Sequence, residues 1–317
     1  MNLIVRLAAP KTEKSLWRRL LRILRRFGPV FRGGSNFFSG SYYLEAFGHS
    51  DTGCVRANNE DYFRIEPQLG LYTVADGMGG ARGGAYASRL AVDTVTEQVV
   101  SATRRDTQVL VAAMEEANRR VVEIAQKTPQ LEGMGTTLLA GLFQGDEVYI
   151  TSVGDSRVYL LDERGLWPVT QDQSWREEVG RRLGLDEVTL RRHPMRNVLT
   201  MAIGHGDPLE VKSYVVQLGP SAMVLMCTDG LHGVVSHADI EDILRDPTDD
   251  RLETKCYRLV EAARQAGGPD NIAVVLVRPT GKAGKRAWLN GLGWRWGARK
   301  PVCQSLFELQ NFRGQMR

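Results

Sequence analysis

The sequence has little cysteine and no long apolar run, and both absences narrow the classes of protein that it can encode. Its four cysteines lie far apart along the 317 residues and form no CxxC pair. This argues against a zinc ribbon, a thioredoxin-like site and a disulfide framework. No stretch approaches the roughly 20 apolar residues of a membrane-spanning helix, and the N-terminus lacks the apolar core and cleavage site of a secretion signal. We therefore expect a soluble, cytoplasmic protein.

Several common catalytic motifs are missing as well. There is no GxSxG segment, so a serine hydrolase with a nucleophile elbow is not expected. The glycine-rich segments GGARGG and GGPDN lack the Lys and the Ser or Thr of a P-loop. The five histidines include no HxxxH pair, so the sequence offers no helix of the zinc-protease type.

The small net charge of +4 conceals a segregation of charge along the chain. Residues 1–34 carry nine Lys and Arg against one acid, and residues 281–317 carry eight against one. The rest of the chain holds 24 basic and 35 acidic residues, a net charge of −11, so nucleic acid is not an expected partner despite a pI near 8.9. We expect a basic N-terminal extension (1–40), a central domain (41–280) and a basic C-terminal tail (281–317).

The central segment combines short apolar runs with amphipathic stretches. Apolar runs that end at Gly or Asp predict strands at 70–77, 136–145, 147–155, 156–163, 223–230 and 271–278. Two-residue connections after positions 144 and 154 predict antiparallel hairpins or tight turns. Helical periodicity predicts helices at 85–100, 107–127 and 251–266. We infer a layered α+β domain, in which antiparallel sheets cover the apolar faces of the helices.

A polar, Arg-rich insertion interrupts this pattern between about Thr170 and Gly206. Insertions of this length inside a compact domain are often functional lids. We therefore interpret the insertion as a candidate lid.

Four aspartates recur at the ends of predicted strands, namely Asp76, Asp155, Asp229 and Asp270. A single aspartate there is more often a turn-former, but four at matching positions can face one cleft. Carboxylates within about 4 Å repel each other by roughly 4 kcal/mol per pair, so the group stays ionised only around cations. Ligation by oxygen alone selects Mg²⁺ or Mn²⁺ over zinc.

A second polar cluster, in the segment 53–61, precedes the first of these predicted strands and contains Arg56, Glu60 and Asp61. Taken alone, this is an ordinary polar turn. Together with the aspartates, Glu60 and Asp61 can hold metal-bound waters, while the planar fork of Arg56 suits a phosphate oxyanion. The combination indicates phosphoryl chemistry.

Seven ordered motifs over residues 44–278 resemble the metal-dependent protein phosphatase family of type 2C, in its bacterial form. They are GCVRANNED (53–61), VADGMGG (74–80), GMGTT (133–137), VGDSR (153–157), HPMRNVLTMAIG (193–204), CTDGL (227–231) and GGPDNIAVV (267–275). The resemblance implies a four-layer α-β-β-α sandwich of two antiparallel sheets flanked by helices. It also implies hydrolysis of phosphoserine and phosphothreonine in proteins.

The resemblance assigns metal ligands at a dinuclear centre. Asp76 would bridge both ions and the Gly77 carbonyl would bind one of them. Asp229 and Asp270 would bind the other ion, and Asp155 would bind a weaker third. The expected cofactors are two Mn²⁺ or Mg²⁺ ions, with a third at Asp155.

The remaining assignments concern water and phosphate. Glu60 and Asp61 would order metal-bound waters, and Arg56 would hold the phosphate. Two ions about 3.5–4 Å apart make a hydroxide nucleophile available near neutral pH, so no covalent intermediate is required.

At one position the chain departs from many members of the family. Where they have a histidine that can protonate the leaving oxygen, this chain has Met78, and a thioether donates no proton. The DGMGG form resembles bacterial members, so activity is still expected. The proton then comes from a metal-bound water or from another histidine, with His193 and His205 as candidates.

The sequence thus predicts a serine/threonine protein phosphatase that acts in signal transduction. Its expected partners are phosphoproteins, such as the substrates of a serine/threonine kinase. The alternative is a pseudophosphatase that binds phosphoproteins without hydrolysing them. That alternative predicts lost metal carboxylates, and none of the matched ones is missing.

The basic segment 15–27 alternates apolar and arginine residues with helical spacing. One interpretation is peripheral binding to an anionic membrane surface, and the other is a helix packed on the acidic domain. The tryptophans of the C-terminal tail allow membrane-interface or nucleic-acid binding, a disordered tail or docking within the molecule.

Overall fold

The computed structural model describes residues 37–39, 42–79, 83–205 and 208–280. The basic segment 15–27 of the predicted N-terminal extension and the predicted C-terminal tail 281–317 lie outside these residues. Of the predicted extension (1–40), the structure describes Phe37–Ser39, which form strand β1. None of the helices in the described ranges has the length and apolar character needed to span a bilayer.

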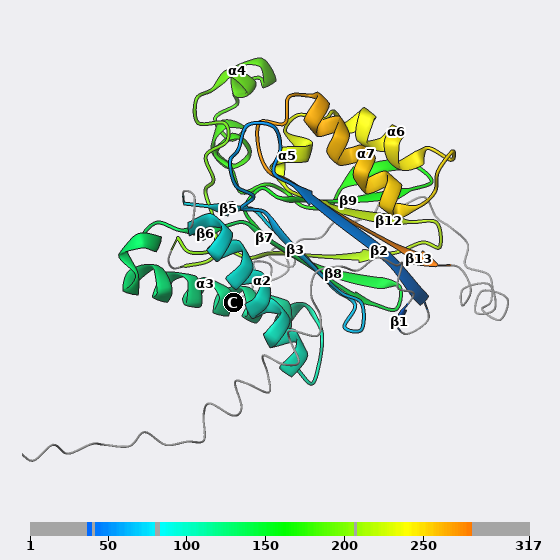
Figure 1. Ribbon diagram of the computed structural model, residues 1–317, viewed down its shortest axis with the longest axis horizontal. Helices are drawn as coiled ribbons and strands as arrows, with labels where there is room; N and C mark the ends of the chain where they lie inside the picture. Colours follow the sequence, from blue (N-terminus) through cyan, green and yellow to red (C-terminus); the bar gives the residue numbers. More distant parts are fainter. Residues whose placement is uncertain (1–36, 40–41, 80–82, 206–207, 281–317) are drawn as a thin grey trace, which may run out of the picture. The chain divides into compact units, whose positions relative to one another are not determined.

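Two antiparallel sheets form the centre of the domain (Figure 1). Sheet A has six strands, in the order β1 (Phe37–Ser39), β2 (Tyr42–Asp51), β13 (Ile272–Thr280), β12 (Met223–Cys227), β9 (Arg157–Asp162) and β10 (Gly165–Pro168). Sheet B has five strands, in the order β11 (Lys212–Gln217), β8 (Glu147–Val153), β7 (Leu138–Gln144), β4 (Leu71–Ala75) and β3 (Tyr62–Glu66). A small ribbon pairs β5 (Gly77–Met78) with β6 (Gly135–Thr136).

The two sheets pack face to face through alternate residues of their strands. The core between them contains Tyr72 and Phe143 of sheet B, whose rings meet edge to face with centroids 5.0 Å apart, and Val224 and Val275 of sheet A. Because successive side chains of a strand point to opposite faces, the intervening residues face outward toward the helices. Leu225 and Leu276 face one helical layer and Leu71 and Leu142 the other.

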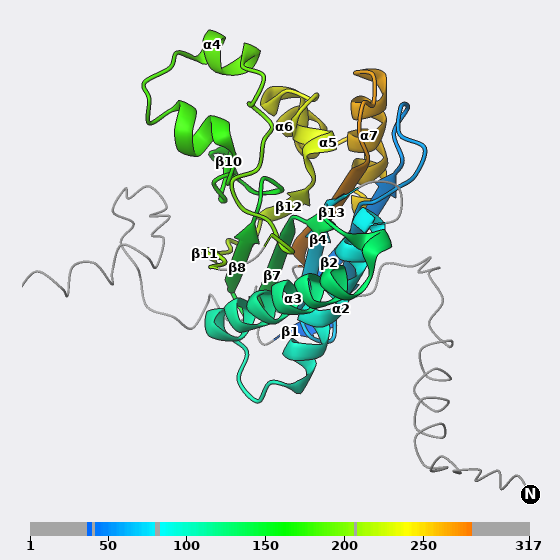
Figure 2. The same ribbon diagram turned by 90° about the vertical axis from the view of Figure 1, so that its left-hand side faces the viewer.

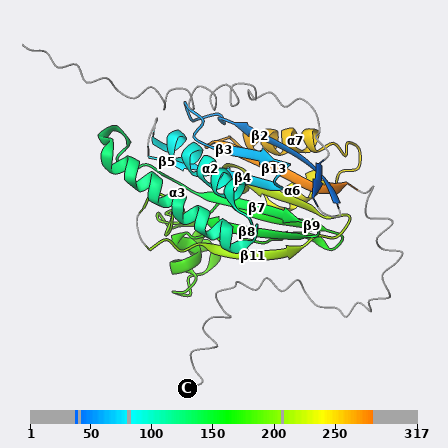
Figure 3. The same ribbon diagram turned by 90° about the horizontal axis from the view of Figure 1, so that it is seen from below.

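Helices cover both outer faces, which completes four layers (Figures 1 and 3). Sheet B carries α2 (Gly83–Ser101) and α3 (Thr107–Lys127), followed by a short 3-10 turn at Pro129–Leu131. Sheet A carries α5 (Asp229–His232), α6 (His237–Arg245) and α7 (Leu252–Gln265). The α3 helix begins where Asp106 caps it, accepting hydrogen bonds from the amides of Gln108 and Val109. The expected fold class is confirmed.

The predicted connection after position 154 is a tight turn between the two sheets and not a hairpin. The runs around β8 and β9 are separated only by Gly154–Ser156, but β8 pairs with β7 and β11 in sheet B, whereas β9 pairs with β10 and β12 in sheet A. Gly154 has φ of +99°, which lets the chain turn sharply from one sheet to the other. This crossing brings the segment with Asp155 to the boundary between the sheets.

The insertion between β10 and β11 forms an irregular unit with its own contacts. It contains a π-helical turn, Arg176–Gly180, and the helix α4 (Glu187–Arg192), which lies beyond the strand ends in two views (Figures 1 and 2). The rings of Trp175 and His193 stack with centroids 3.9 Å apart and fasten the two halves together.

Candidate metal centre

The four strand-end aspartates meet at one end of the sandwich. Asp76 follows β4, Asp155 follows β8, Asp229 begins α5 directly after β12, and Asp270 precedes β13. All four line one cleft of about 830 Å³. Because β4 and β8 belong to sheet B while β12 and β13 belong to sheet A, the cleft lies where the two sheets meet.

The other predicted site residues lie at the same place. Arg56, Glu60 and Gly77 also line the cleft, and Asp61 is buried next to it with 7% of its surface exposed. The hydroxyl of Thr228 donates to Asp61 Oδ2 at 2.7 Å and accepts from the Ala273 amide at 2.9 Å. Thr228 therefore ties Asp61 to sheet A.

The carboxylates of the cleft are held in surroundings that disfavour their charge. Burial, reinforced by repulsion from neighbouring carboxylates, raises the pKa of Asp61, Asp76 and Asp229. The same causes raise the pKa of Asp155 to about 8. These carboxylates can all be ionised at the same time only when a cation compensates their negative charge.

Two oxygens of this group have unmet bonding capacity. Asp61 Oδ1 and Asp229 Oδ1 are buried and have no hydrogen-bond partner. Within the described ranges, no three His, Cys, Asp or Glu side chains form a closed set of metal ligands. Because Mg²⁺ keeps several waters and is usually held by one or two carboxylates, hydrated ions fit this open arrangement.

Arg56 and Asp270 form an ion pair across the cleft, with Nη2 and Oδ2 2.8 Å apart. Half of the Arg56 side chain is exposed, so the guanidinium stands at the rim where an oxyanion could reach it. Asn271 shapes this rim, because its side chain bonds the Glu60 amide and the carbonyls of Thr52 and Asn58, all at 2.9 Å. Sequence reasoning placed Asn271 in a motif but assigned it no role.

The backbone of Asp76 is fixed by two threonines that the sequence marked only as part of GMGTT. The Thr137 hydroxyl accepts from the Asp76 amide at 3.0 Å, and the Thr136 hydroxyl donates to the Asp76 carbonyl at 2.8 Å. Thr137 also bonds the Ser156 hydroxyl at 2.7 Å, next to Asp155. These bonds connect the ribbon, sheet B and the crossing to sheet A.

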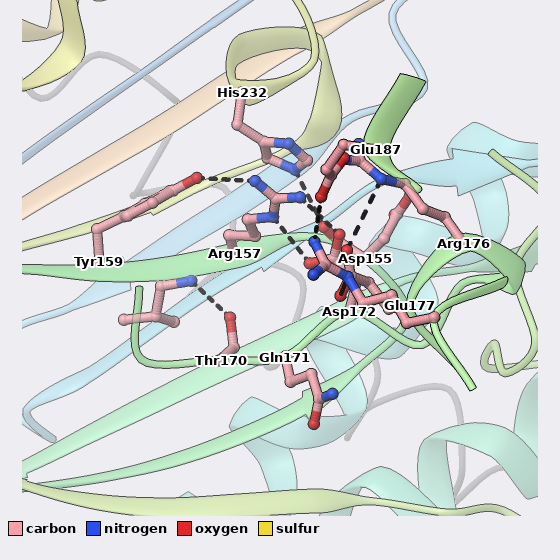
Figure 4. Close-up of polar contacts among 12 residues, drawn as sticks. Asp155, Arg157, Tyr159, Thr170, Gln171, Asp172, Arg176, Glu177, Glu187 and His232 are labelled. Carbon is pink, nitrogen blue, oxygen red and sulfur yellow. Dashed lines mark hydrogen bonds and ion pairs between the residues drawn. The ribbon is translucent and has the colours of Figure 1, made fainter. Parts of the chain in front are cut away.

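A partly buried ion pair ties β9 to the start of the insertion, near Asp155 (Figure 4). Arg157 donates two hydrogen bonds to Asp172, at 2.8 and 2.7 Å, and one to the Tyr159 hydroxyl at 3.1 Å. His232 Nε2 lies 3.0 Å from the Asp155 carbonyl oxygen. The sequence analysis did not identify Asp172. Its ion-pair partner Arg157, however, lies inside the VGDSR motif.

The end of the insertion forms one wall of the cleft, through residues 197–202. Of the two candidate proton donors there, His205 lines the cleft, as does Met78. His193 does not, because its ring is stacked on Trp175.

Comparisons with known proteins agree with this geometry. The model of the protein phosphatase 2C family matches residues 54–261. The chain is 35% identical to the serine/threonine phosphatase Stp of Listeria welshimeri over 241 residues, which cover 72% of this chain and 93% of that protein.

Solved structures show the same likeness. The Mycobacterium tuberculosis serine/threonine phosphatase PstP superimposes with a TM-score of 0.67 at 33% identity, covering 74% of this chain and 98% of that one. The catalytic domain of PstP in complex with two manganese ions gives a TM-score of 0.66 at 32% identity, covering 75% and 98%. The chain belongs to the protein phosphatase 2C family and is a serine/threonine phosphatase.

Proposed function

We propose that the protein hydrolyses phosphoserine and phosphothreonine in proteins by direct attack of water at a dinuclear Mn²⁺ or Mg²⁺ centre. The observation that carries this proposal is the buried group of carboxylates at the cleft, in which Asp61 Oδ1 and Asp229 Oδ1 lack partners. The solved PstP catalytic domain with two manganese ions supports it by likeness.

The ligands would come from both sheets. Asp76 and the Gly77 carbonyl lie on the sheet B side, and Asp229 and Asp270 lie on the sheet A side. Asp155 would serve a third, weaker ion. Bound there, the ions would lower the pKa of a water and neutralise charge on the phosphoryl oxygens.

The protein's own residues would orient the ester. The exposed guanidinium of Arg56 can form a bidentate pair with a phosphate once the phosphate competes with Asp270 for it. Glu60 and Asp61 would accept hydrogen bonds from ordered waters in the cleft.

The decisive experiment measures Mn²⁺-dependent phosphate release from a phosphothreonine peptide and from p-nitrophenyl phosphate. We expect Asp229→Asn to lower both rates at least about 100-fold, since it removes a charge that stabilises the transition state through the cation. Calorimetric titration should show weakened Mn²⁺ binding by the same variant.

Asp242→Asn is the matched control, because Asp242 is exposed on α6 away from the cleft. It should leave both the rates and the Mn²⁺ affinity unchanged. An inert wild type that still binds phosphopeptides would favour the pseudophosphatase alternative.

A further inference from the structure

Hydrolysis of a serine or threonine ester leaves an alkoxide oxygen that needs a proton, and few groups at the cleft can supply one. The aspartates are assigned to the cations. Arg56 stays protonated in proteins, and the thioether of Met78 has no proton to give. Among the described residues that line the cleft, His205 is the one with an imidazole, a side chain that donates a proton when it is protonated.

The backbone before His205 is fixed against the ribbon. Ile203 and Thr136 exchange two backbone hydrogen bonds, at 2.9 and 3.0 Å, and the Gly204 amide donates to Asn118 of α3 at 2.8 Å. Gly204 has φ of +97°, and a Cβ there would lie 2.7 Å from the Met134 carbonyl oxygen. The chain therefore reaches His205 through a tightly held turn.

This turn sets the imidazole beside Met78. Gly135 pairs with Met78 in the ribbon. A Cβ built on Gly135 would lie 3.0 Å from His205 Nδ1 and 3.1 Å from its Cε1, so the ring occupies the space that a side chain would take. His205 is exposed and lines the cleft, so both a bound substrate and solvent can reach the ring.

The other four histidines are engaged elsewhere. His193 stacks on Trp175, and its Nδ1 accepts from the Met195 amide at 3.2 Å. His232 and His237 each have Nε2 3.0 Å from a backbone carbonyl, and His49 packs on the ring of Tyr257. None of these four lines the cleft.

We propose that His205 is the catalytic acid that protonates the leaving serine or threonine oxygen. As water adds its oxygen to phosphorus, the bond from phosphorus to the ester oxygen breaks, and that oxygen takes the imidazolium proton. The proton released by the attacking water restores the imidazolium through solvent, so the products are the free hydroxyl and inorganic phosphate. The proposal rests on the proposed function, because it presupposes attack by water at the metal centre.

The test compares a phosphothreonine peptide with p-nitrophenyl phosphate, whose leaving group departs without a proton. His205→Gln should lower kcat for the peptide about 100-fold, the usual size of a general-acid effect, with little change in KM. The rate with p-nitrophenyl phosphate should stay at the wild-type value. His237→Gln is the matched control, because His237 is exposed on α6 and does not line the cleft, and it should leave both rates unchanged.

Two rescues separate chemistry from structure. Met78→His, combined with His205→Gln, should restore peptide turnover, because position 78 lies beside the same ring across the ribbon. Imidazole added to His205→Ala should do the same. The melting temperature and calorimetric Mn²⁺ affinity of each variant verify that the fold and the metal centre are intact.

Equal losses on both substrates, or full peptide activity in His205→Gln, would overturn the assignment of His205 while leaving the metal-dependent hydrolysis standing. A wild type that releases no phosphate from either substrate would instead overturn the proposed function and this assignment with it.

Discussion

Gly77 shows how one residue type can be required by its surroundings. A Cβ at this position would lie 2.2 Å from the Gly84 carbonyl oxygen and 2.7 Å from that of Glu60. Gly84 is confined in the same way, since its Cβ would lie 2.2 Å from Glu60 Oε2. The two glycines let the ribbon, the start of α2 and Glu60 converge beside Asp76.

We therefore expect Gly77→Ala to displace the Asp76–Gly77 backbone. It should lower the free energy of unfolding by about 1–3 kcal/mol, the usual cost of overpacking, and weaken Mn²⁺ binding. Urea unfolding and calorimetric titration measure the two effects. Gly219→Ala is the control, because no atom lies within 4 Å of a Cβ there. Unaltered Mn²⁺ affinity in Gly77→Ala would contradict this account of the site.

A titratable carboxyl group attaches the insertion to its neighbours, so we expect this attachment to weaken at low pH. Glu178 accepts from Lys212 Nζ at 2.8 Å and from the Thr200 hydroxyl at 2.6 Å, which links the π-helical turn to β11 and to the cleft wall. Burial acts to raise the pKa of Glu178, but its bonds to Lys212 and Thr200 outweigh burial and hold the pKa below its ordinary value.

Since the folded pKa lies below the unfolded one, the stabilisation by Glu178 is complete above the ordinary range of a glutamate. It is lost as pH falls through the lower folded value. The protection of amides in residues 174–200 against hydrogen exchange, taken relative to the intrinsic exchange rate at each pH, should fall several-fold as the solution is acidified below about pH 4. Glu178→Gln should show fast exchange already at neutral pH. The exposed Glu163, mutated to Gln, should behave as wild type. A wild-type protection factor that does not change with pH would speak against the link.

At the scale of elements, the helical periodicity of apolar residues predicted the helices well, whereas the apolar runs did not predict how the strands pair. The helical stripes at 107–127 and 251–266 lie within a residue of α3 and α7, because a 3.6-residue period survives whatever the helix packs on. The run 136–145 instead divides: its first residue, Thr136, belongs to β6 in the ribbon, and residues 138–144 form β7. Short strands such as β3 and β11 escaped prediction, since half-buried strands carry a weaker local pattern.

At the scale of the whole molecule, the acidic centre and the basic ends suggest separate tasks. The net charge of −11 in the central part suits a cleft for divalent cations. We propose that the basic segment 15–27, which lies outside the described residues, tethers the enzyme to anionic lipid. Its five arginines at about 1 kcal/mol each would suffice for reversible binding.

Flotation of the full chain with vesicles that contain anionic lipid tests this tether. We expect the full chain to float with these vesicles and not with neutral ones, and binding to weaken as salt screens the charges. A chain lacking residues 1–34, which keeps strand β1, should remain at the bottom of the gradient. If it floats as well as the full chain does, the tether is not in this segment.

The sequence by itself determined the family, the aspartates and glycines of the cleft, and the main helices, because those depend on residue type and local spacing. The tertiary structure decided which sheet each strand joins, and so it placed Asp155 at the boundary between the two sheets. It also decided that Thr228, Asn271 and Asp172 support the site. It also distinguished His205 from His193, two histidines at the same insertion. The physical reason is that contacts between residues far apart in the chain depend on packing of whole layers, which no local pattern records.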